Sequence, residues 1–592
     1  MRTLYVAKDH LYYTPEREGR LVRSGSFRSG RPTLTLLYRV MARSPDRRWE
    51  AVGLAVLVLA TALLLGRGLD DSIATPGNDE PRHAMNGVFL YDALRDGMSW
   101  RLPDLLTYAR RYYARYPALS LGFHPPLLAA AEVPFVALVG AGLTAGRLTT
   151  AVFFIAVVLG LYALVARLYG RMAAGVSAVV CASNPTLLDL ARQVMSETPA
   201  IALSIGTVFF LERFCARQRR HDLAILVVVA AASVYAKQLA GLLFPAYAIY
   251  AVVRLGPRRM LRRDTVTAMV VLAVLVSPLV PLTLRMSSWN VDWVADAAIG
   301  GGSRASRLQP IVSALSAQLS VSMLLLAGLG LARIVIQRDR RGLLLIAWLG
   351  AAMASVAFVT RGVEPVRYGI YMLPPLMVLV GAASVGWSSR AVRAAVLGLT
   401  TVAVGSQALA AASLPAERTP GYEAAARFVL DRPRGTTVLY SAEVDSGLFV
   451  LFTRKHDPAR HAIVLRADKL FVTAALDRFV EDRISTREEI YDALRRFGVG
   501  YVVIEDRPGR STVLNWLREE TRSSRFAERF RTPIGSANRR LNGVSIAVYE
   551  FLEATAPDPA AVISMDIPVA RSAVAVRLAD VVSGGRRSAP LR

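Results

Sequence analysis

Apolar runs of about 20 residues recur along the first 412 residues of the chain. Such a run matches the hydrocarbon thickness of a bilayer, and in lipid its backbone hydrogen bonds must close within the segment, as they do in a helix. The chain is therefore predicted to be a polytopic α-helical membrane protein. We predict eleven spans, at residues 49–67, 147–168, 172–190, 196–214, 222–236, 238–254, 265–285, 311–335, 342–360, 367–387 and 391–412.

Another apolar segment, residues 125–143, is almost long enough to be a twelfth span. It contains Glu132 and Pro134, and a full crossing would invert the side of every later loop. We therefore predict an interfacial or re-entrant helix at the outer leaflet. This leaves residues 68–146 as one large outer loop.

The net charge of +26 has a topological explanation. Arginine clusters fall in short segments between the predicted spans, as the positive-inside bias requires, and we predict no nucleic-acid partner. Residues 1–48 are then a basic cytoplasmic tail, residues 49–412 a transmembrane domain in the cytoplasmic (inner) membrane, and everything after residue 413 extracytoplasmic.

The composition changes after residue 413, where helical and strand patterns alternate. A helix is predicted to begin after Thr419, and another, "TREEIYDALRRFG", to end at Gly498. Four strands are predicted, at "TTVLYSA", "HAIVLRA", "VGYVVIE" and "VSIAVYEF". Residues 413–556 are thus predicted to form an α/β domain. Residues 557–592, rich in Ala, Pro, Ser and Arg, are predicted to be disordered.

Charged residues gather at the outer ends of the predicted spans. They include Asp79, Glu80, Arg82 and His83 in the first loop, His124 before two prolines, Glu197, Lys237, Glu364 and Arg367. Costly polar groups at membrane depth usually mark function. A cavity at the outer leaflet suits a substrate with a lipid tail and a charged, sugar-bearing head: His124, Lys237 and Arg367 would hold a phosphate, and a carboxylate would deprotonate an attacking hydroxyl.

The same residues carry a family resemblance. "NDEPRHAMNG" resembles the first-loop motif of the GT-C glycosyltransferases, closest to the dolichyl-phosphate-mannose protein mannosyltransferases and the aminoarabinose transferases. "FHPPLLAAAEVPF", "ARQVMSETPAIAL", "VYAKQLAGLLFP" and "EPVRYGIYMLPPL" resemble later motifs of that family in the same order, over residues 50–390.

The resemblance implies a GT-C fold of about 11–13 spans and an inverting hexosyl or pentosyl transferase that uses a polyprenyl-phosphate sugar donor. It implies that Asp79 is the catalytic base, with Glu80 as its neighbour and Glu197 as a second acidic site. His124, Lys237 and the pair Arg367 and Tyr368 would then contact the donor phosphate. No metal ligands or cofactor are assigned, and a divalent metal requirement stays open, as does the acceptor: a glycan, a lipid or a protein.

Structural alternatives stay open for these residues. Asp79 also suits a solvated loop carboxylate, and Glu80 or Glu197 a helix N-terminus. Lys237 suits a snorkelling position, His124 an ordinary membrane interface, and Arg367 a charge that only sets the topology. Tyr108, Tyr112, Tyr113 and Tyr116 are interpreted as an interface belt rather than a sugar platform. The alternatives for the whole chain are a lipid-linked sugar transporter or flippase, and an inactive scaffold of the same fold.

Overall fold

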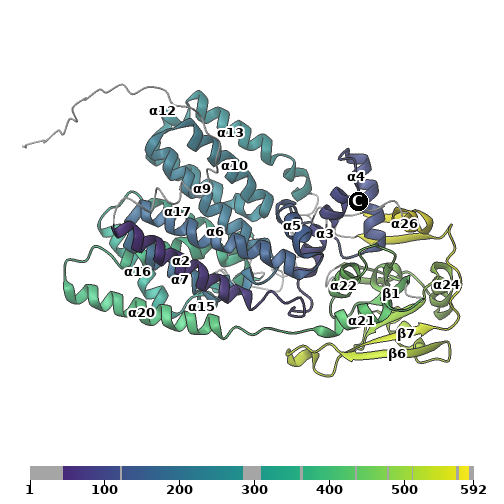
Figure 1. Cartoon of the computed structure of the whole chain (residues 1–592). Coiled ribbons are helices and arrows are strands. Elements are labelled where there is room, and N and C mark those ends of the chain that lie inside the picture. The colour runs from purple at the N-terminus through teal and green to yellow at the C-terminus, as the bar shows by residue number, and fades with distance from the viewer. Residues whose placement is uncertain are drawn as a thin grey trace, which may run out of the picture. The chain divides into compact units, whose positions relative to one another are not determined.

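The computed structural model describes residues 45–120, 123–284, 308–359, 364–433, 436–475, 479–509, 511–567 and 572–585. Most of the predicted cytoplasmic tail, residues 1–44, lies outside this part. Residues 57–592 form one unit by their contacts, and helices dominate it up to residue 412 (Figure 1).

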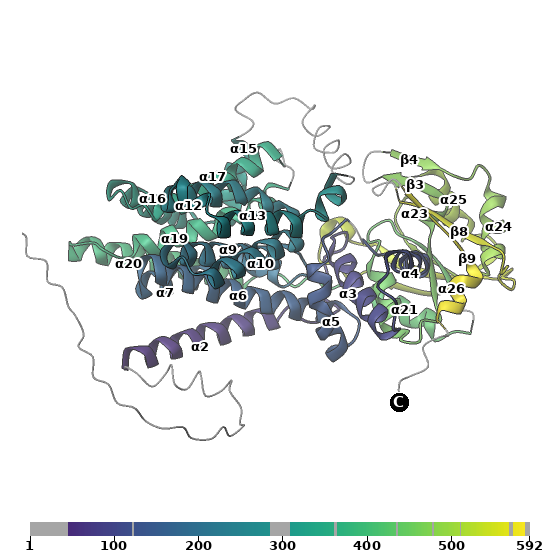
Figure 2. The ribbon, with the colours of Figure 1, turned by 90° about the horizontal axis from the view of Figure 1, so that it is seen from above.

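Seven helices of the described residues are long and apolar enough to cross a membrane. They correspond to α2 (Pro45–Gly66), α6 (Leu143–Tyr169), α9 (Glu197–Arg217), η1 with α11 (Gln238–Leu243, Phe244–Leu255), α17 with η3 (Gly342–Ala354, Ser355–Val359), α18 to α19 (Pro365–Tyr368, η4 Gly369–Met372, Leu373–Ala383) and α20 (Arg390–Ala412). Figure 2 shows α6, α9 and α10 (Arg220–Ala236) running alongside one another. The predicted multi-pass helical fold is confirmed.

Two predicted spans are bent pairs of helices instead of straight ones. Helices α7 (Arg171–Ala182) and α8 (Pro185–Ala191) meet at 61°, and α15 (Gln309–Gln318) and α16 (Val321–Ile336) at 110°. Pro185 lacks the N–H that a continuous helix needs, and the side chain of Asn184 caps the new helix by accepting from the N–H of Leu187 at 3.0 Å. The apolar pattern runs through both breaks, so it does not reveal them.

The other two predicted spans are shorter helices in the described residues. Residues 222–236 lie in α10, which has 17 residues, and residues 265–285 begin with α13 (Arg263–Val276), which has 14. Residues 257–260 form the short helix α12 (Pro257–Met260) between basic residues.

In the described residues of the first outer loop lie the helices α3 (Glu80–Arg95), α4 (Leu102–Arg115) and α5 (Leu127–Val139). Helix α5 has 13 residues, about 20 Å at the rise of an α-helix, which is less than the hydrocarbon thickness. Its interfacial position stays a prediction.

The region after residue 413 contains a five-stranded sheet in the order β2-β1-β5-β7-β6. The strands are β1 (Thr437–Ser441), β2 (Ile463–Arg466), β5 (Tyr501–Glu505), β6 (Phe526–Pro533) and β7 (Ser545–Phe551). Strands β2, β1 and β5 are parallel, whereas β7 is antiparallel to both β5 and β6. All four strands predicted from the sequence are present.

Helices surround this sheet: α21 (Pro420–Leu430), α22 (Leu448–His456), α24 (Arg487–Phe497) and α25 (Thr512–Glu520). The remaining short elements are α23 (Ala467–Leu470), β3 (Val472–Ala475), β4 (Phe479–Asp482) and η5 (Arg539–Leu541). Thr419 is the N-cap of α21 as predicted, although its side chain makes no capping hydrogen bond. Gly498 ends α24 in the left-handed conformation, with φ +62°.

The prediction of disorder after residue 557 is wrong for residues 562–567 and 572–585. Strands β8 (Val562–Ile567) and β9 (Ser572–Arg577) form a hairpin, and α26 (Leu578–Gly585) follows it. Ile563 pairs with Val576 and Met565 with Val574, all four of them buried. This period-two alternation is a strand pattern that the Ala, Pro, Ser and Arg content obscured. Residues 586–592 lie outside the described part.

One buried cluster joins the first outer loop to the sheet region. Tyr112 lies in α4 and Tyr116 is the C-cap of that helix. Both pack in the same core as Tyr422 and Tyr440. Tyr112 and Tyr116 are 5% and 0% exposed, so the interpretation of the tyrosines as an interface belt is wrong for these two. The composition alone did not distinguish a core tyrosine from an interfacial one.

Candidate functional site

Four of the predicted site residues lie at helix ends or breaks that converge. Asp79 is the N-cap of α3, and Glu197 is the first residue of α9. Lys237 lies in the break between α10 and η1, and Arg367 lies in the short helix α18. Residues separated by up to 288 positions in the sequence thus meet in one cluster.

Arg367 connects the two acidic residues of this cluster. Its Nε donates to Oε1 of Glu197, and its Nη1 donates to Oδ2 of Asp79 at 3.2 Å. The Nζ of Lys237 also donates to Oε1 of Glu197. Arg367 Nη1 also donates to Oε2 of Glu364 at 3.2 Å, and Arg82 contacts Asp79 at 3.4 Å, so three carboxylates face three cations. The side chain of Glu197 is fully buried, while those of Arg367 and Asp79 are 20% and 24% exposed.

Tyr368 supports both cations with the face of its ring. The Nζ of Lys237 lies 5.2 Å from the ring centroid and the Cζ of Arg367 lies 5.9 Å from it. These distances allow cation–π attraction, which strengthens where water is excluded. The predicted residue pair Arg367 and Tyr368 therefore belongs to the cluster.

His124 pairs with His83, which the sequence analysis grouped with the residues at the outer span ends without giving it a role. Their ring centroids are 4.1 Å apart, and the Nε2 atom of each is buried without a hydrogen-bond partner in the described structure. Burial lowers the pKa of His83 to about 4, and burial together with His83 lowers the pKa of His124 well below 6.5. Both rings are neutral at pH 7. The available signal was spacing, because His83 follows Asp79 by four residues on one helix face.

Asp79 is a carboxylate at neutral pH. Burial by itself would raise its pKa, but His124, which carries a proton only at low pH where Asp79 titrates, together with Arg367 and Arg82 opposes that effect and lowers the pKa to about 2. The carboxylate is therefore ready to accept a proton, although its cations make it a weak base as long as they stay in contact with it.

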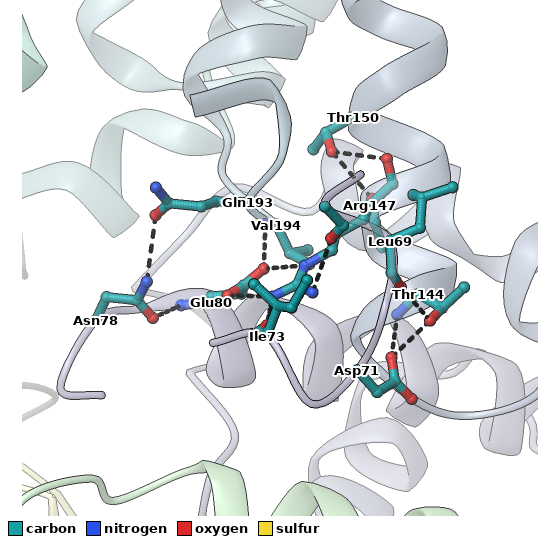
Figure 3. A network of polar contacts seen from close by, with 12 residues as sticks. Leu69, Asp71, Ile73, Asn78, Glu80, Thr144, Arg147, Thr150, Gln193 and Val194 are labelled. Carbon is teal, nitrogen blue, oxygen red and sulfur yellow. Dashed lines mark hydrogen bonds and ion pairs between the residues drawn. The ribbon is translucent and has the colours of Figure 1, made fainter. Parts of the chain in front are cut away.

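Glu80, although adjacent to Asp79, points toward Arg147 (Figure 3). Its carboxylate accepts from Nε and Nη2 of Arg147 at 2.7 and 2.9 Å, and from the backbone N–H of Val194 at 3.0 Å. The side chains of Glu80 and Arg147 are 1% and 2% exposed. The structure thus brings Asp79 and Glu197 together and places Glu80 in a separate ion pair.

Arg147 also binds the backbone that leads into the first loop. Its guanidinium donates to the carbonyl oxygens of Gly68, Asp70 and Ile73, and the neighbouring Thr144 donates to Asp71 (Figure 3). This network fixes the start of α3, where Asp79 lies, against α6. Arg147 was missed by the sequence analysis, and its signal was a lone arginine in the first turn of an apolar span.

The C-terminal region contacts the loop that carries Asp79. Arg82 donates to Oδ1 of Asp79 at 3.4 Å and to Oγ of Ser446 at 2.9 Å. The backbone N–H of Gly77 donates to Oδ2 of Asp445 at 2.7 Å. The sheet region therefore helps to position the acidic end of α3.

The chemistry of the cluster suits an anion and a hydroxyl better than a metal ion. In the part of the chain that the structure describes, no group of three or more His, Cys, Asp or Glu residues has the arrangement of a metal site. Arg367 and Lys237 provide donors for a phosphate, and Asp79 provides a proton acceptor beside them.

Part of the chain matches a known protein family. Residues 123–281 match the family model described as dolichyl-phosphate-mannose-protein mannosyltransferase. A search of curated proteins finds no match to the chain.

Two solved structures have a similar fold. ArnT from Cupriavidus metallidurans, bound to undecaprenyl phosphate, is 14% identical, with 83% of this chain and 97% of that chain covered and a TM-score of 0.50. The oligosaccharyltransferase AglB from Archaeoglobus fulgidus, in complex with an inhibitory peptide and a dolichol-phosphate, is 12% identical, with 84% and 75% covered and a TM-score of 0.51. The family match and the shared architecture confirm that this chain has the GT-C glycosyltransferase fold and resembles the protein mannosyltransferases and aminoarabinose transferases.

Proposed function

We propose that this chain is a membrane glycosyltransferase that transfers a sugar from a polyprenyl-phosphate donor to a hydroxyl of an envelope acceptor. The family match and the lipid phosphates named for ArnT and AglB support this class of donor. The acceptor is a glycan, a glycolipid or a protein, and the sugar is a hexose or a pentose.

The observation that carries the proposal is the position of Arg367 between Asp79 and Glu197. In the absence of substrate its charge is shared by the carboxylates of Asp79, Glu197 and Glu364. A donor phosphate that binds Arg367 and Lys237 would compete with Asp79 for the guanidinium. The charge that holds the Asp79 pKa low would then be partly neutralised, and Asp79 would become a stronger base when the donor is in place.

The proposed reaction is a single displacement at the anomeric carbon. Asp79 takes the proton of the acceptor hydroxyl while the acceptor oxygen forms a bond to the anomeric carbon. The bond from that carbon to the phosphate oxygen breaks, and its electron pair leaves with the polyprenyl phosphate. One displacement inverts the anomeric configuration. Arg367 and Lys237 stabilise the charge that develops on the leaving phosphate.

The other predicted residues have supporting roles in this proposal. The ring of Tyr368 holds the two cations, Lys237 and Arg367. His124 and His83 border the site as a neutral pair. A second negative charge on the leaving phosphate would favour protonation of this pair. Glu80 maintains the start of α3 through Arg147. We place the cluster and the sheet region on the outer side of the cytoplasmic membrane and the basic loops on the cytoplasmic side.

The test uses purified full-length chain with a panel of radiolabelled polyprenyl-phosphate sugars. We expect one donor to release polyprenyl phosphate in proportion to glycosylated product, and Asp79→Asn to lower the rate by about 10²–10⁴. Asp104→Asn is the matched control, because Asp104 is an exposed carboxylate of the same loop.

Other outcomes contradict the proposal in distinguishable ways. Movement of the intact lipid-linked sugar across a vesicle membrane without release of polyprenyl phosphate would indicate a flippase. Full transfer by the Asp79→Asn variant would remove Asp79 from the reaction, and donor binding without turnover across the panel would favour an inactive scaffold.

A further inference from the structure

A second polar cavity lies at the other end of the helical region. It has a volume of about 370 Å³ and is formed by the ends of α6, α16 and α19 and by the loop between α16 and α17. Its polar lining residues are Arg167, Tyr169, Arg333, Gln337, Asp339 and Arg341. Three arginines against one aspartate give this lining an excess of positive charge.

The length of α6 separates this cavity from the Asp79 cluster. Arg147, near the start of α6, binds Glu80, and Tyr169 is the last residue of the same helix. At 1.5 Å per residue the interval between them is about 33 Å, close to the thickness of the hydrocarbon core. The cavity therefore lies at the opposite membrane face.

Hydrogen-bond donors in the cavity wall lack acceptors. Within the described structure the Nε atoms of Arg167 and Arg333 and the hydroxyl of Tyr169 are buried without a partner. The other contacts of the arginines are to helix ends: Arg341 donates to the carbonyl of Leu168 at 2.8 Å, and Arg333 donates to that of Ala382 at 2.5 Å. Unpaired buried donors next to a cationic cavity favour an anion with several oxygens.

We propose that this cavity binds the phosphate group of an anionic lipid headgroup in the leaflet opposite the Asp79 cluster. Basic pockets between transmembrane helices recognise such headgroups, and the guanidinium fork matches the oxygens of a phosphate. Arg167 carries the specificity, because it has no hydrogen bond or ion pair of its own in the described part of the chain. Free phosphate offers the same oxygens, so the test separates the two sources.

The test measures binding to the purified full-length chain and is independent of transfer activity. Short-chain phosphatidylglycerol, short-chain phosphatidylcholine and inorganic phosphate are added separately in detergent, and bound lipid is counted by native mass spectrometry together with the thermal midpoint. We expect phosphatidylglycerol to bind at least about tenfold more tightly than phosphatidylcholine, and Arg167→Gln to lower its affinity about tenfold.

Matched variants keep the result interpretable. Arg340→Gln removes an exposed charge from the same loop outside the cavity and should leave binding unchanged. Tyr169→Phe removes one unpaired hydroxyl without a change of charge and should weaken binding severalfold. A rise of the thermal midpoint with inorganic phosphate, absent in Arg167→Gln, would identify free phosphate as the source. Equal loss in Arg340→Gln and Arg167→Gln, or no loss in either, overturns the proposal, because Arg167 would then contribute nothing to lipid binding that an exposed arginine outside the cavity does not.

Discussion

Replacing Glu80 with glutamine removes one charge from a buried ion pair and leaves the side-chain volume almost unchanged. The carboxylate receives two hydrogen bonds from Arg147 and one from Val194. The glutamine oxygen still accepts one of them, but the guanidinium loses its counter-charge. Breaking a buried pair by removing one partner costs about 3–5 kcal/mol. Since Arg147 keeps three backbone acceptors, we expect the lower end, about 3 kcal/mol.

The assay compares the thermal midpoint in detergent with the rate of sugar transfer. Glu80→Gln should lower the midpoint by several degrees, and transfer at low temperature should largely persist because Glu80 lies outside the Asp79 cluster. The double variant Glu80→Gln, Arg147→Met should be less destabilised than the sum of the single variants, since it leaves no unpaired charge. Asp79→Asn is the comparison, with lost transfer and a small change of midpoint, because Asp79 is partly exposed.

One result refutes this reasoning. If Glu80→Gln keeps the wild-type midpoint and loses transfer, the charge of Glu80 acts on the reaction and not on the fold. The catalytic role that the family resemblance implied for Glu80 would then hold. The buried pair with Arg147 would act on the electrostatics of the reaction rather than on the stability of the fold.

Three further predictions concern the donor, the histidines and the topology. Arg367→Ala should weaken inhibition by free polyprenyl phosphate and lower turnover with little change in the acceptor KM; unchanged inhibition with a raised acceptor KM would assign Arg367 to the other substrate. Burial lowers the pKa of His83 from 6.5 to about 4, so between these pH values the unfolded chain takes up a proton that the folded chain does not. The stability of the folded chain should therefore fall as the pH falls from about 6.5 to about 4. In a pH series of thermal midpoints, His83→Gln should flatten that slope. A cysteine introduced at the exposed Ser485 should react with an impermeant thiol reagent added outside intact cells, whereas one at the exposed Arg259 should not. The native Cys181 and Cys215 are buried and give little background labelling. The reverse labelling pattern would invert the proposed topology.

Part of the candidate site could be predicted from local sequence and part could not. Asp79, Glu197, Lys237 and Arg367 were selected because charged residues at span ends are costly unless they have a function, and the structure brings these four together. The pairing with Arg147 that separates Glu80 from Asp79 was not predictable. It depends on a contact across 67 positions of the sequence, and no local pattern encodes which of two adjacent acids faces an arginine on another helix.

The sequence by itself determined the membrane class, the segments that become helices and the four strands predicted for the sheet region. These follow from the length and period of apolar runs, which are local properties. The tertiary structure alone decided where the apolar runs bend, that residues 562–567 pair with residues 572–577, and that Tyr112 and Tyr116 enter a core shared with the sheet region. The physical reason is the same in each case. Burial of an apolar run lowers the free energy of the chain wherever the run packs, so its composition determines that it is buried. Its packing partners and its direction depend on caps, ion pairs and contacts that form only when distant segments meet.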